Sequence, residues 1–219
     1  MNFSTAEENY IKAIFRLQQT DSNVTTNELS AELKTKPASV TDMLKRLKEK
    51  KILHYERYYG VTLTAEGKKV ALSIIRRHRL WEYFLAEKLH FSWDAVHSIA
   101  EELEHVSSNE LIERLDEFLG FPKNDPHGDP IPDKNGKVEI INQIHLHQLK
   151  ENVPAIVTAV GDQKSSLLEM LRLKNIIIGT KLEIKKRFEF DDSVEIKIRN
   201  QPLTTLSNQL AKNIFVKPI

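Results

Sequence analysis

The amino-acid sequence predicts a mainly α-helical chain with small β parts, and three patterns support this fold class. Apolar residues recur at helical spacing through most of residues 4–119. A short turn between two of these segments, followed by two short β-rich runs, is typical of a winged helix-turn-helix. Beyond residue 150 the apolar residues alternate with period two, as in short strands. We therefore expect a winged helix-turn-helix, a helical middle and a β-rich C-terminal domain.

The first predicted domain, residues 1–72, contains three helices and a β-hairpin. Capping-box patterns at residues 4–7 and 25–28 indicate where the first two helices begin. Pro37 stands at the start of the third helix, where its missing N–H costs no helical hydrogen bond. Residues 52–63 predict two strands about a turn, which form the wing.

The exposed face of the third predicted helix carries small hydroxyl and basic side chains. Residues 34–57 contain eight Lys and Arg against three Asp and Glu. Hydroxyl groups near the start of a recognition helix can reach base edges, and lysines contact phosphates. The alternative is a small three-helix scaffold without a nucleic-acid role. We favour double-stranded DNA as the partner, with the contacting residues Lys36, Pro37, Ala38, Ser39, Thr41, Asp42, Lys45 and Arg57.

The second predicted domain, residues 73–140, is acidic and helical. Residues 73–120 contain five Lys and Arg against ten Asp and Glu. Helical periodicity predicts helices at about 65–90, 93–107 and 108–119. Three helices of this length cannot easily bury all their apolar surface alone, which favours a symmetric homodimer.

Histidines and carboxylates share helix faces in this middle region. Four of them fall within about a 100° arc of one predicted helix, namely His97, Glu101, Glu104 and His105. His78 and Glu82 stand four residues apart, so both can reach one point beside their helix. Carboxylate and imidazole together suit a divalent first-row metal ion. The alternative is a solvated acidic face on an amphipathic helix.

Composition and motif counts exclude several kinds of protein. The chain has no cysteine, so it can form neither a disulfide nor a thiolate metal site. No apolar run approaches the roughly 20 residues that span a membrane, and the first residues do not resemble a signal peptide. We expect a cytoplasmic protein without a membrane partner. A di-metal enzyme of the ferritin-like kind, one alternative function, needs Glu-x-x-His motifs within a long four-helix bundle. Glu102 and His105 match the motif, but the sequence predicts no such bundle.

Three features occur together: the helix-turn-helix with its wing, the stretch Arg77-His78-Arg79-Leu80 with Glu82, and the stretch Glu101-x-x-Glu104-His105-Val106-Ser107. In this combination the chain resembles the diphtheria-toxin-repressor family of metal-activated transcriptional repressors. The resemblance spans the whole chain and is strongest over residues 4–132. It implies a homodimer without enzymatic activity that binds operator DNA and controls metal-uptake genes. In that family a divalent ion ties the first helix to the dimerisation helices, and two adjacent sites are usual.

By matching position, the resemblance also implies which residues bind metal. The primary site is a set of four side chains: Asn9, Glu101, Glu104 and His105. The second site contains His78, Glu82 and His97. Two further pairs are candidates for the second site, Asp125 and His127 in a turn-rich connector and Asp162 and Gln163 in the C-terminal domain. A plain turn, and a purely structural or peptide-binding domain, are the alternatives for these pairs.

The identity of the metal follows from the ligand types that the resemblance implies. Glu101 stands where iron-sensing members have cysteine and manganese-sensing members have glutamate. Asn9 stands where the family has Met or Asp, and Lys12 where manganese sensors often carry a glutamate, while Glu8 could contribute a ligand. Oxygen-rich ligands without a thiolate suit Mn²⁺ or Fe²⁺. We expect Mn²⁺ with Fe²⁺ as the alternative, and a winged-helix regulator that needs no metal is the remaining alternative function.

The third predicted domain, residues 150–219, is rich in β-structure. Its expected strands are 154–160, 181–185, 194–199 and 214–216. Its expected helices lie around residues 165–173 and near 205–213. This pattern resembles the SH3-like barrel at the C-terminus of longer members of the family.

Overall fold

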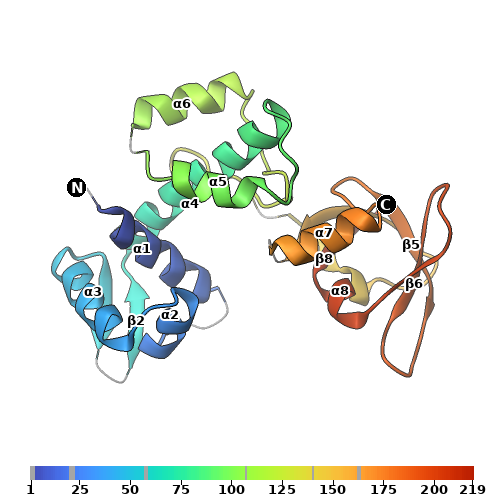
Figure 1. The fold of residues 1–219 in the computed structure, drawn as a ribbon, viewed down its shortest axis with the longest axis horizontal. Helices are drawn as coiled ribbons and strands as arrows, with labels where there is room; N and C mark the ends of the chain where they lie inside the picture. Colours follow the sequence, from blue (N-terminus) through green and yellow to red (C-terminus); the bar gives the residue numbers. More distant parts are fainter. Residues whose placement is uncertain (1–2, 20–22, 57–58, 107, 140, 162–163) are drawn as a thin grey trace. The chain divides into compact units, whose positions relative to one another are not determined.

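The computed structural model describes residues 3–19, 23–56, 59–106, 108–139, 141–161 and 164–219 (Figure 1). The chain divides into two compact units. The first comprises Met1–His78, Glu102–Asn109 and Pro132–Val138, and the second comprises Arg79–Glu101, Glu110–Ile131 and Glu139–Ile219. Among the helices of these described ranges, none is long and apolar enough to cross a membrane.

The first unit contains the winged helix-turn-helix that the sequence predicts. Its elements are α1 (Thr5–Leu17), α2 (Thr26–Glu32), α3 (Pro37–Glu49) and the antiparallel strands β1 (Leu53–Glu56) and β2 (Gly60–Leu63). Capping boxes begin α1 at Ser4 and α2 at Thr25, and Pro37 opens α3, as expected. The apolar faces of these elements pack into one core that includes Ile11, Ile14, Leu29, Val40, Leu44, Leu47 and Ile52.

Three helices follow the wing: α4 (Ala65–Glu87), α5 (Val96–Leu103) and α6 (Asn109–Phe118). The helix predicted over residues 93–107 is wrong at both ends. Ser92 to Ala95 form a turn in which the Ala95 N–H donates to the Ser92 carbonyl oxygen at 2.8 Å. At the other end α5 stops at Leu103, and Glu104 and His105 lie in the turn after it. Leu80 of α4 packs with apolar residues of α6 and of the loop after it, Ile112, Leu115, Leu119 and Ile131.

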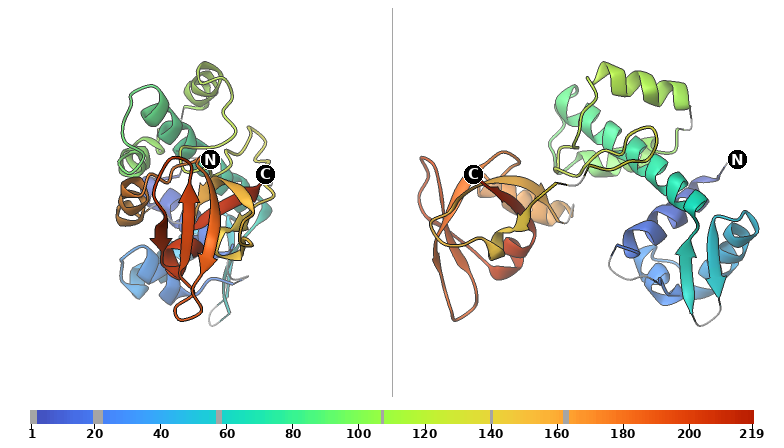
Figure 2. Two further views of the ribbon diagram at one scale, coloured as in Figure 1. Left: turned by 90° about the vertical axis from the view of Figure 1, so that its right-hand side faces the viewer. Right: turned by 180° about the vertical axis from the view of Figure 1, so that it is seen from behind.

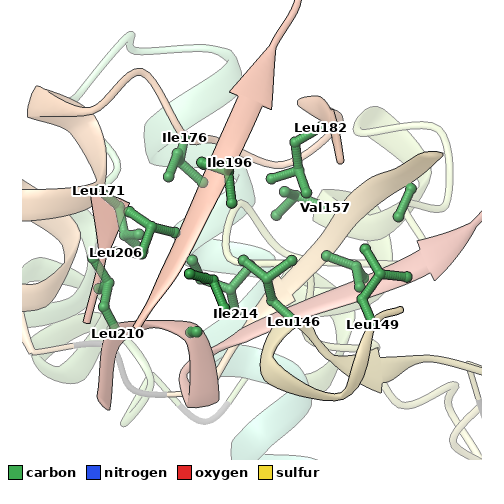
Figure 3. Close-up of a cluster of buried hydrophobic side chains, with 14 of the residues drawn as sticks. Leu146, Leu149, Val157, Leu171, Ile176, Leu182, Ile196, Leu206, Leu210 and Ile214 are labelled. Atoms are coloured by element: carbon green, nitrogen blue, oxygen red, sulfur yellow. The ribbon is translucent and has the colours of Figure 1, made fainter. Parts of the chain in front are cut away.

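The C-terminal domain is a six-stranded antiparallel sheet in the order β3-β8-β4-β5-β6-β7. Figure 2 shows its ribbon, coloured from yellow to red, from two further sides. Its strands are β3 (Ile144–His145), β4 (Pro154–Val160), β5 (Lys181–Arg187), β6 (Val194–Ile198), β7 (Thr204–Leu206) and β8 (Ile214–Pro218). Register shifts in β4 and β5 increase the local twist, which lets the sheet curve around its core. That core includes Leu146, Val157, Leu171, Ile196 and Ile214 (Figure 3).

The helices of this domain are α7 (Ser165–Leu173), α8 (Asn208–Lys212) and the short 3₁₀ helix η1 (Leu146–Gln148). The helix predicted near residues 205–213 is therefore too long at its start. Leu206 is buried and pairs with Val194 of β6, which keeps residues 204–206 in a strand. The Ser207 hydroxyl then accepts a hydrogen bond from the Leu210 N–H at 3.2 Å and caps α8.

Candidate metal centre and DNA-binding surface

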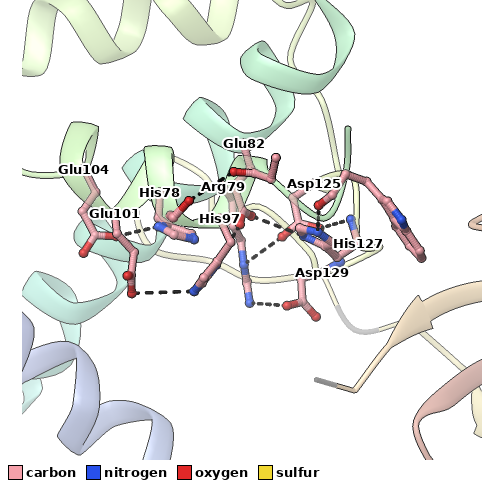
Figure 4. Close-up of polar contacts among 12 residues, drawn as sticks. His78, Arg79, Glu82, His97, Glu101, Glu104, Asp125, His127 and Asp129 are labelled. Atoms are coloured by element: carbon pink, nitrogen blue, oxygen red, sulfur yellow. Dashed lines mark hydrogen bonds and ion pairs between the residues drawn. The ribbon is translucent and has the colours of Figure 1, made fainter. Parts of the chain in front are cut away.

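Three buried side chains of the second unit form a cluster of ligand type. Glu82 lies on α4, and Asp125 and His127 lie in the loop after α6. One ligand atom from each of the three lies within 4.8 Å of the other two. Their exposed fractions are 0%, 4% and 0%. Figure 4 draws the three side chains with the polar groups around them. Carboxylates are rarely buried this deeply unless a cation or hydrogen bonds compensate them.

The backbone of the loop holds this cluster in place. The Asp125 Oδ1 atom accepts hydrogen bonds from the N–H groups of His127 and Asp129, both at 2.9 Å. The Val160 N–H, at the end of β4, donates to the His127 carbonyl oxygen at 3.0 Å. Gly128 has a φ of +90°, and a Cβ atom there would lie 2.0 Å from the Thr158 carbonyl oxygen. The loop can therefore approach β4 this closely only with glycine at that position.

The ring of His127 is oriented for ligand binding. Its Nε2 lies 2.8 Å from the Trp93 carbonyl oxygen, which can only accept, so Nε2 carries the proton. Nδ1 lies 3.7 Å from the Glu82 Oε2 atom and makes no hydrogen bond within the described part of the chain. A histidine whose other nitrogen donates to a carbonyl is the usual arrangement of a metal ligand.

The electrostatics of the cluster also fit a cation. Burial, followed by the negative charges of Asp129 and Glu82, raises the pKa of Asp125 to about 8 against the opposing charge of Arg79. Arg79 compensates in part, because its Nη2 lies 3.3 Å from Asp129 and its Nε lies 3.6 Å from Asp125. Burial lowers the pKa of His127, but contact with Glu82 outweighs it and the pKa is raised. Burial thus disfavours the charged form of Asp125, and a divalent ion held by the cluster would favour it.

The histidine of α5 reaches the same carboxylate. The His97 Nδ1 atom lies 3.1 Å from Glu82 Oε1, and its Nε2 lies 3.6 Å from Glu101 Oε1. His78 precedes Glu82 by one turn of α4, the spacing from which the sequence predicts a shared ligand point. One ligand atom from each of His78, Glu82 and His97 lies within 4.8 Å of the other two. The structure therefore gathers the predicted second site in two clusters that share Glu82, while Glu101 of the predicted primary site lies against His97.

Three further predicted ligands, Asn9, Glu104 and His105, lie in the first unit and have different surroundings. The fully buried Glu104 contacts Lys12 Nζ at 2.6 Å and His78 Nδ1 at 2.6 Å. The His105 Nδ1 atom lies 2.6 Å from Glu8 Oε2, and the other Glu8 oxygen pairs with Arg77 at 2.7 Å. Burial raises the pKa of Glu104, but the hydrogen bond from His78 and the charge of Lys12 outweigh it, so the pKa is lowered. These carboxylates already have protein cations as partners.

Glu8, which the resemblance implies only as a possible additional ligand, belongs to this group of side chains around Glu104 and His105. It contacts His105, whereas Asn9, the expected ligand beside it on α1, is half-buried. A signal for this was present, because Glu8 and Lys12 are four apart and so lie on one face of α1. Asp162 and Gln163, the candidate ligands just after β4, lie outside the described residues.

The predicted DNA-contacting residues lie along the start of α3. Six of them are exposed: Lys36, Pro37, Ala38, Ser39, Asp42 and Lys45. Thr41 is half-buried, and its hydroxyl donates to the Pro37 carbonyl oxygen at 3.0 Å. Lys45 and Asp42 form an exposed pair at 3.4 Å, which contributes little to stability and leaves the lysine available to a phosphate. Arg57, which the sequence predicts in the wing, lies outside the described residues.

A winged helix followed by a buried carboxylate and histidine cluster defines a DNA-binding protein with a centre of metal-ligand type. Comparison with protein families identifies the class. Residues 2–61 match the iron dependent repressor N-terminal DNA binding domain, residues 64–133 the iron dependent repressor metal binding and dimerisation domain, and residues 144–218 the FeoA domain. The chain belongs to this family of metal-dependent transcriptional repressors, as the sequence resemblance implies.

Individual relatives agree with this membership. An uncharacterized HTH-type transcriptional regulator of Methanocaldococcus jannaschii is 34% identical over 117 residues, which are 53% of this chain and 94% of that protein. The iron-dependent repressor IdeR of Mycobacterium tuberculosis is 24% identical over 225 residues, covering 97% and 96%. A solved manganese-dependent transcriptional repressor in complex with manganese has a TM-score of 0.87 at 30% identity, covering 97% of this chain and 100% of that one.

The comparisons confirm the predicted fold class, with a winged helix-turn-helix, a helical dimerisation domain and a C-terminal FeoA domain. They also set aside the ferritin-like enzyme, because the family consists of transcriptional repressors. The relatives include both manganese- and iron-dependent repressors, so the cofactor class is a divalent metal.

Proposed function

We propose that this chain is a cytoplasmic, homodimeric repressor of metal-uptake genes whose affinity for operator DNA rises when Mn²⁺ occupies a centre built around Glu82. Fe²⁺ is the alternative ion. The observation that carries the proposal is the fully buried cluster of Glu82, Asp125 and His127, with a histidine nitrogen directed at a carboxylate. Such a cluster is costly in the absence of a cation and is compensated in its presence.

The proposed ligands come from three segments. They are His78 and Glu82 on α4, His97 on α5, and Asp125 and His127 in the loop. Asp162 and Gln163 remain candidates, since β4 ends at Val160 and the loop is hydrogen-bonded to that strand end. All these donors are oxygen or imidazole nitrogen and the chain has no cysteine, which supports Mn²⁺ or Fe²⁺ and disfavours Cu⁺.

The proposed activation follows from where the ligands lie in the chain. A divalent ion would supply positive charge that several ligands share. Glu82, His97 and the loop would then lose conformational freedom relative to one another, and α4, which carries Glu82, starts directly after the wing. The metal-loaded dimer would therefore lose less ordering free energy than the metal-free dimer when its two recognition helices enter successive major grooves. By thermodynamic reciprocity, operator DNA tightens metal binding by the same factor.

The proposed dimer is supported by exposed apolar residues near the metal centre in sequence. Leu111 and Phe118 stand seven apart on α6, and Phe121 follows the helix. Their exposed fractions are 40%, 66% and 60%. Large exposed apolar side chains on one helix face are typical of a protein interface, and the matching family model describes this segment as a dimerisation domain.

The test measures DNA affinity as a function of metal. An operator is selected from a random duplex library with the Mn²⁺-loaded protein, and binding is followed by fluorescence anisotropy at constant ionic strength, because salt alone changes DNA affinity. We expect Mn²⁺ to tighten binding roughly 5- to 150-fold over chelator, the usual range for coupled sites. His127→Ala should lose this response, and the control His90→Asn, at an exposed position, should keep it. Equal affinity in chelator, Mn²⁺, Fe²⁺ and Zn²⁺ would refute the proposal.

A further inference from the structure

The carboxylates between α1 and the turn after α5 are neutralised by the protein itself. Lys12 Nζ contacts Glu104 Oε1 at 2.6 Å, with side chains 12% and 0% exposed. Arg77 contacts Glu8 at 2.7 Å, with side chains 9% and 10% exposed. His105 completes the link, because its Nδ1 lies 2.6 Å from the second oxygen of Glu8. These contacts join α1 to the Glu104–His105 turn through protein side chains.

The charge balance differs from that of the centre around Glu82. Here two carboxylates, Glu8 and Glu104, face two permanent cations, Lys12 and Arg77. A divalent ion added to this group would bring an excess of positive charge into a site shielded from water, where repulsion between like charges is strong. The Lys12 ammonium also occupies the position beside Glu104 Oε1 that a metal would need. The donor set therefore does not fit an ion, although the family resemblance implies one there.

We propose that Lys12 is the resident cation of this position, so that its ammonium group ties α1 to Glu104 in place of a metal ion and limits the protein to the single centre around Glu82. The exclusion of metal at Glu104 is argued only from the contacts of Lys12 with Glu104 and of Arg77 with Glu8. The expected total of one ion per subunit also rests on the proposed function. Lys12 thereby determines metal stoichiometry.

Replacing Lys12 tests the proposal, since Lys12→Met keeps the side-chain length and removes the charge. Glu104 is then a buried carboxylate without its ammonium partner, which creates affinity for a cation. Mn²⁺ bound per subunit is measured by equilibrium dialysis at a concentration that saturates the wild type. We expect one ion for the wild type and two for Lys12→Met. Lys50→Met is the matched control, because Lys50 forms a similar pair with Glu7 of α1 at 2.6 Å, and it should bind one.

Two further measurements keep the result interpretable. In chelator, Lys12→Met should melt at a lower temperature than the wild type, and Mn²⁺ should raise its Tm by more than it raises that of the wild type. If Lys12→Met does not fold, Lys12→Gln replaces it, because an amide retains a hydrogen-bond donor for Glu104 without the charge, and it should likewise bind the extra ion.

The two proposals fail separately. A His127→Ala variant that still binds one ion would count against the Glu82 centre. It would not bear on the proposed role of Lys12. The double variant Lys12→Met/His127→Ala should bind one ion, at the position that Lys12 vacates. Two ions in the wild type, or no additional ion in both Lys12→Met and Lys12→Gln, would overturn the assignment of Lys12.

Discussion

The two ring nitrogens of His127 lie in different surroundings. Nε2 donates to the Trp93 carbonyl oxygen, while Nδ1 faces Glu82. The ring also stacks on Trp93, with centroids 5.8 Å apart and an angle of 29°. Both contacts fix the ring before any ligand arrives, so little rotamer entropy would be lost on binding. The sequence indicates His127 as a candidate, but the tautomer depends on a residue 34 positions away.

Asp125 allows a prediction that separates the metal role from the structural one. Asp125→Asn keeps an oxygen for the two loop N–H groups and removes a carboxyl whose pKa of about 8 shows that its charge is disfavoured. We expect an unchanged Tm in chelator. Mn²⁺ at about 100 times its Kd should stabilise the wild type by about 2.7 kcal/mol and should not stabilise the variant.

Asp133→Asn is the control for this measurement by differential scanning calorimetry. Asp133 accepts two loop N–H groups in the same pattern, from Asn135 and Lys137, but is exposed. Its variant should respond to Mn²⁺ as the wild type does. A Tm several degrees lower for Asp125→Asn in chelator would contradict this account of Asp125.

Residue types and spacing identify most of the centre, but not its partition into two clusters. His78 and Glu82 follow from their helical spacing, and His97 is a candidate because it shares a helix face with other ligand types. The family resemblance groups these three and adds Asp125 and His127. The pairing of Lys12 with Glu104 joins residues 92 positions apart. A local pattern cannot predict such a contact, because it depends on how α1 packs in the folded unit.

At the scale of elements, the loop at residues 125–129 is held by β4 of the C-terminal domain. The contact of Gly128 with Thr158 and the hydrogen bond from Val160 to His127 connect the candidate centre to the FeoA domain. The C-terminal domain thus holds the loop that carries two of the proposed ligands, Asp125 and His127.

Gly128→Ala should loosen this connection. A positive φ costs an L-residue about 1–2 kcal/mol, and the clash with the Thr158 oxygen adds a further 1–3 kcal/mol or so. We expect a lower free energy of unfolding in urea and weaker Mn²⁺ binding. Gly120→Ala is the matched control, because Gly120 has a φ of +76° and a Cβ there would meet nothing within 4 Å. If both variants lose equal stability, the close approach to β4 has no energetic role.

Short-range sequence signals predict where the first three helices begin, but not where α5 ends or where β7 lies. Capping boxes and Pro37 predict the starts of α1, α2 and α3, because those contacts lie within a few residues. The end of α5 and the strand β7 are set by distant partners: the buried Glu104 contacts Lys12, and Leu206 pairs with Val194. Periodicity alone extends helices through both segments.

At the scale of the whole molecule, two copies of the chain are needed to present two recognition helices to DNA. Phe118→Glu places a charge on the exposed apolar face of α6, where a desolvated carboxylate would oppose association. We expect a monomer by light scattering and an operator affinity reduced at least tenfold. The adjacent exposed variant Glu117→Ala should remain dimeric. A dimeric Phe118→Glu protein would place the interface elsewhere.

The most direct test of the proposed centre is the anomalous scattering of manganese in crystals of the Mn²⁺-loaded protein. The account predicts one strong peak per subunit, within coordination distance of Glu82, Asp125 and the Nδ1 atom of His127. A peak beside Glu104 with Lys12 displaced, and none at Glu82, would contradict it.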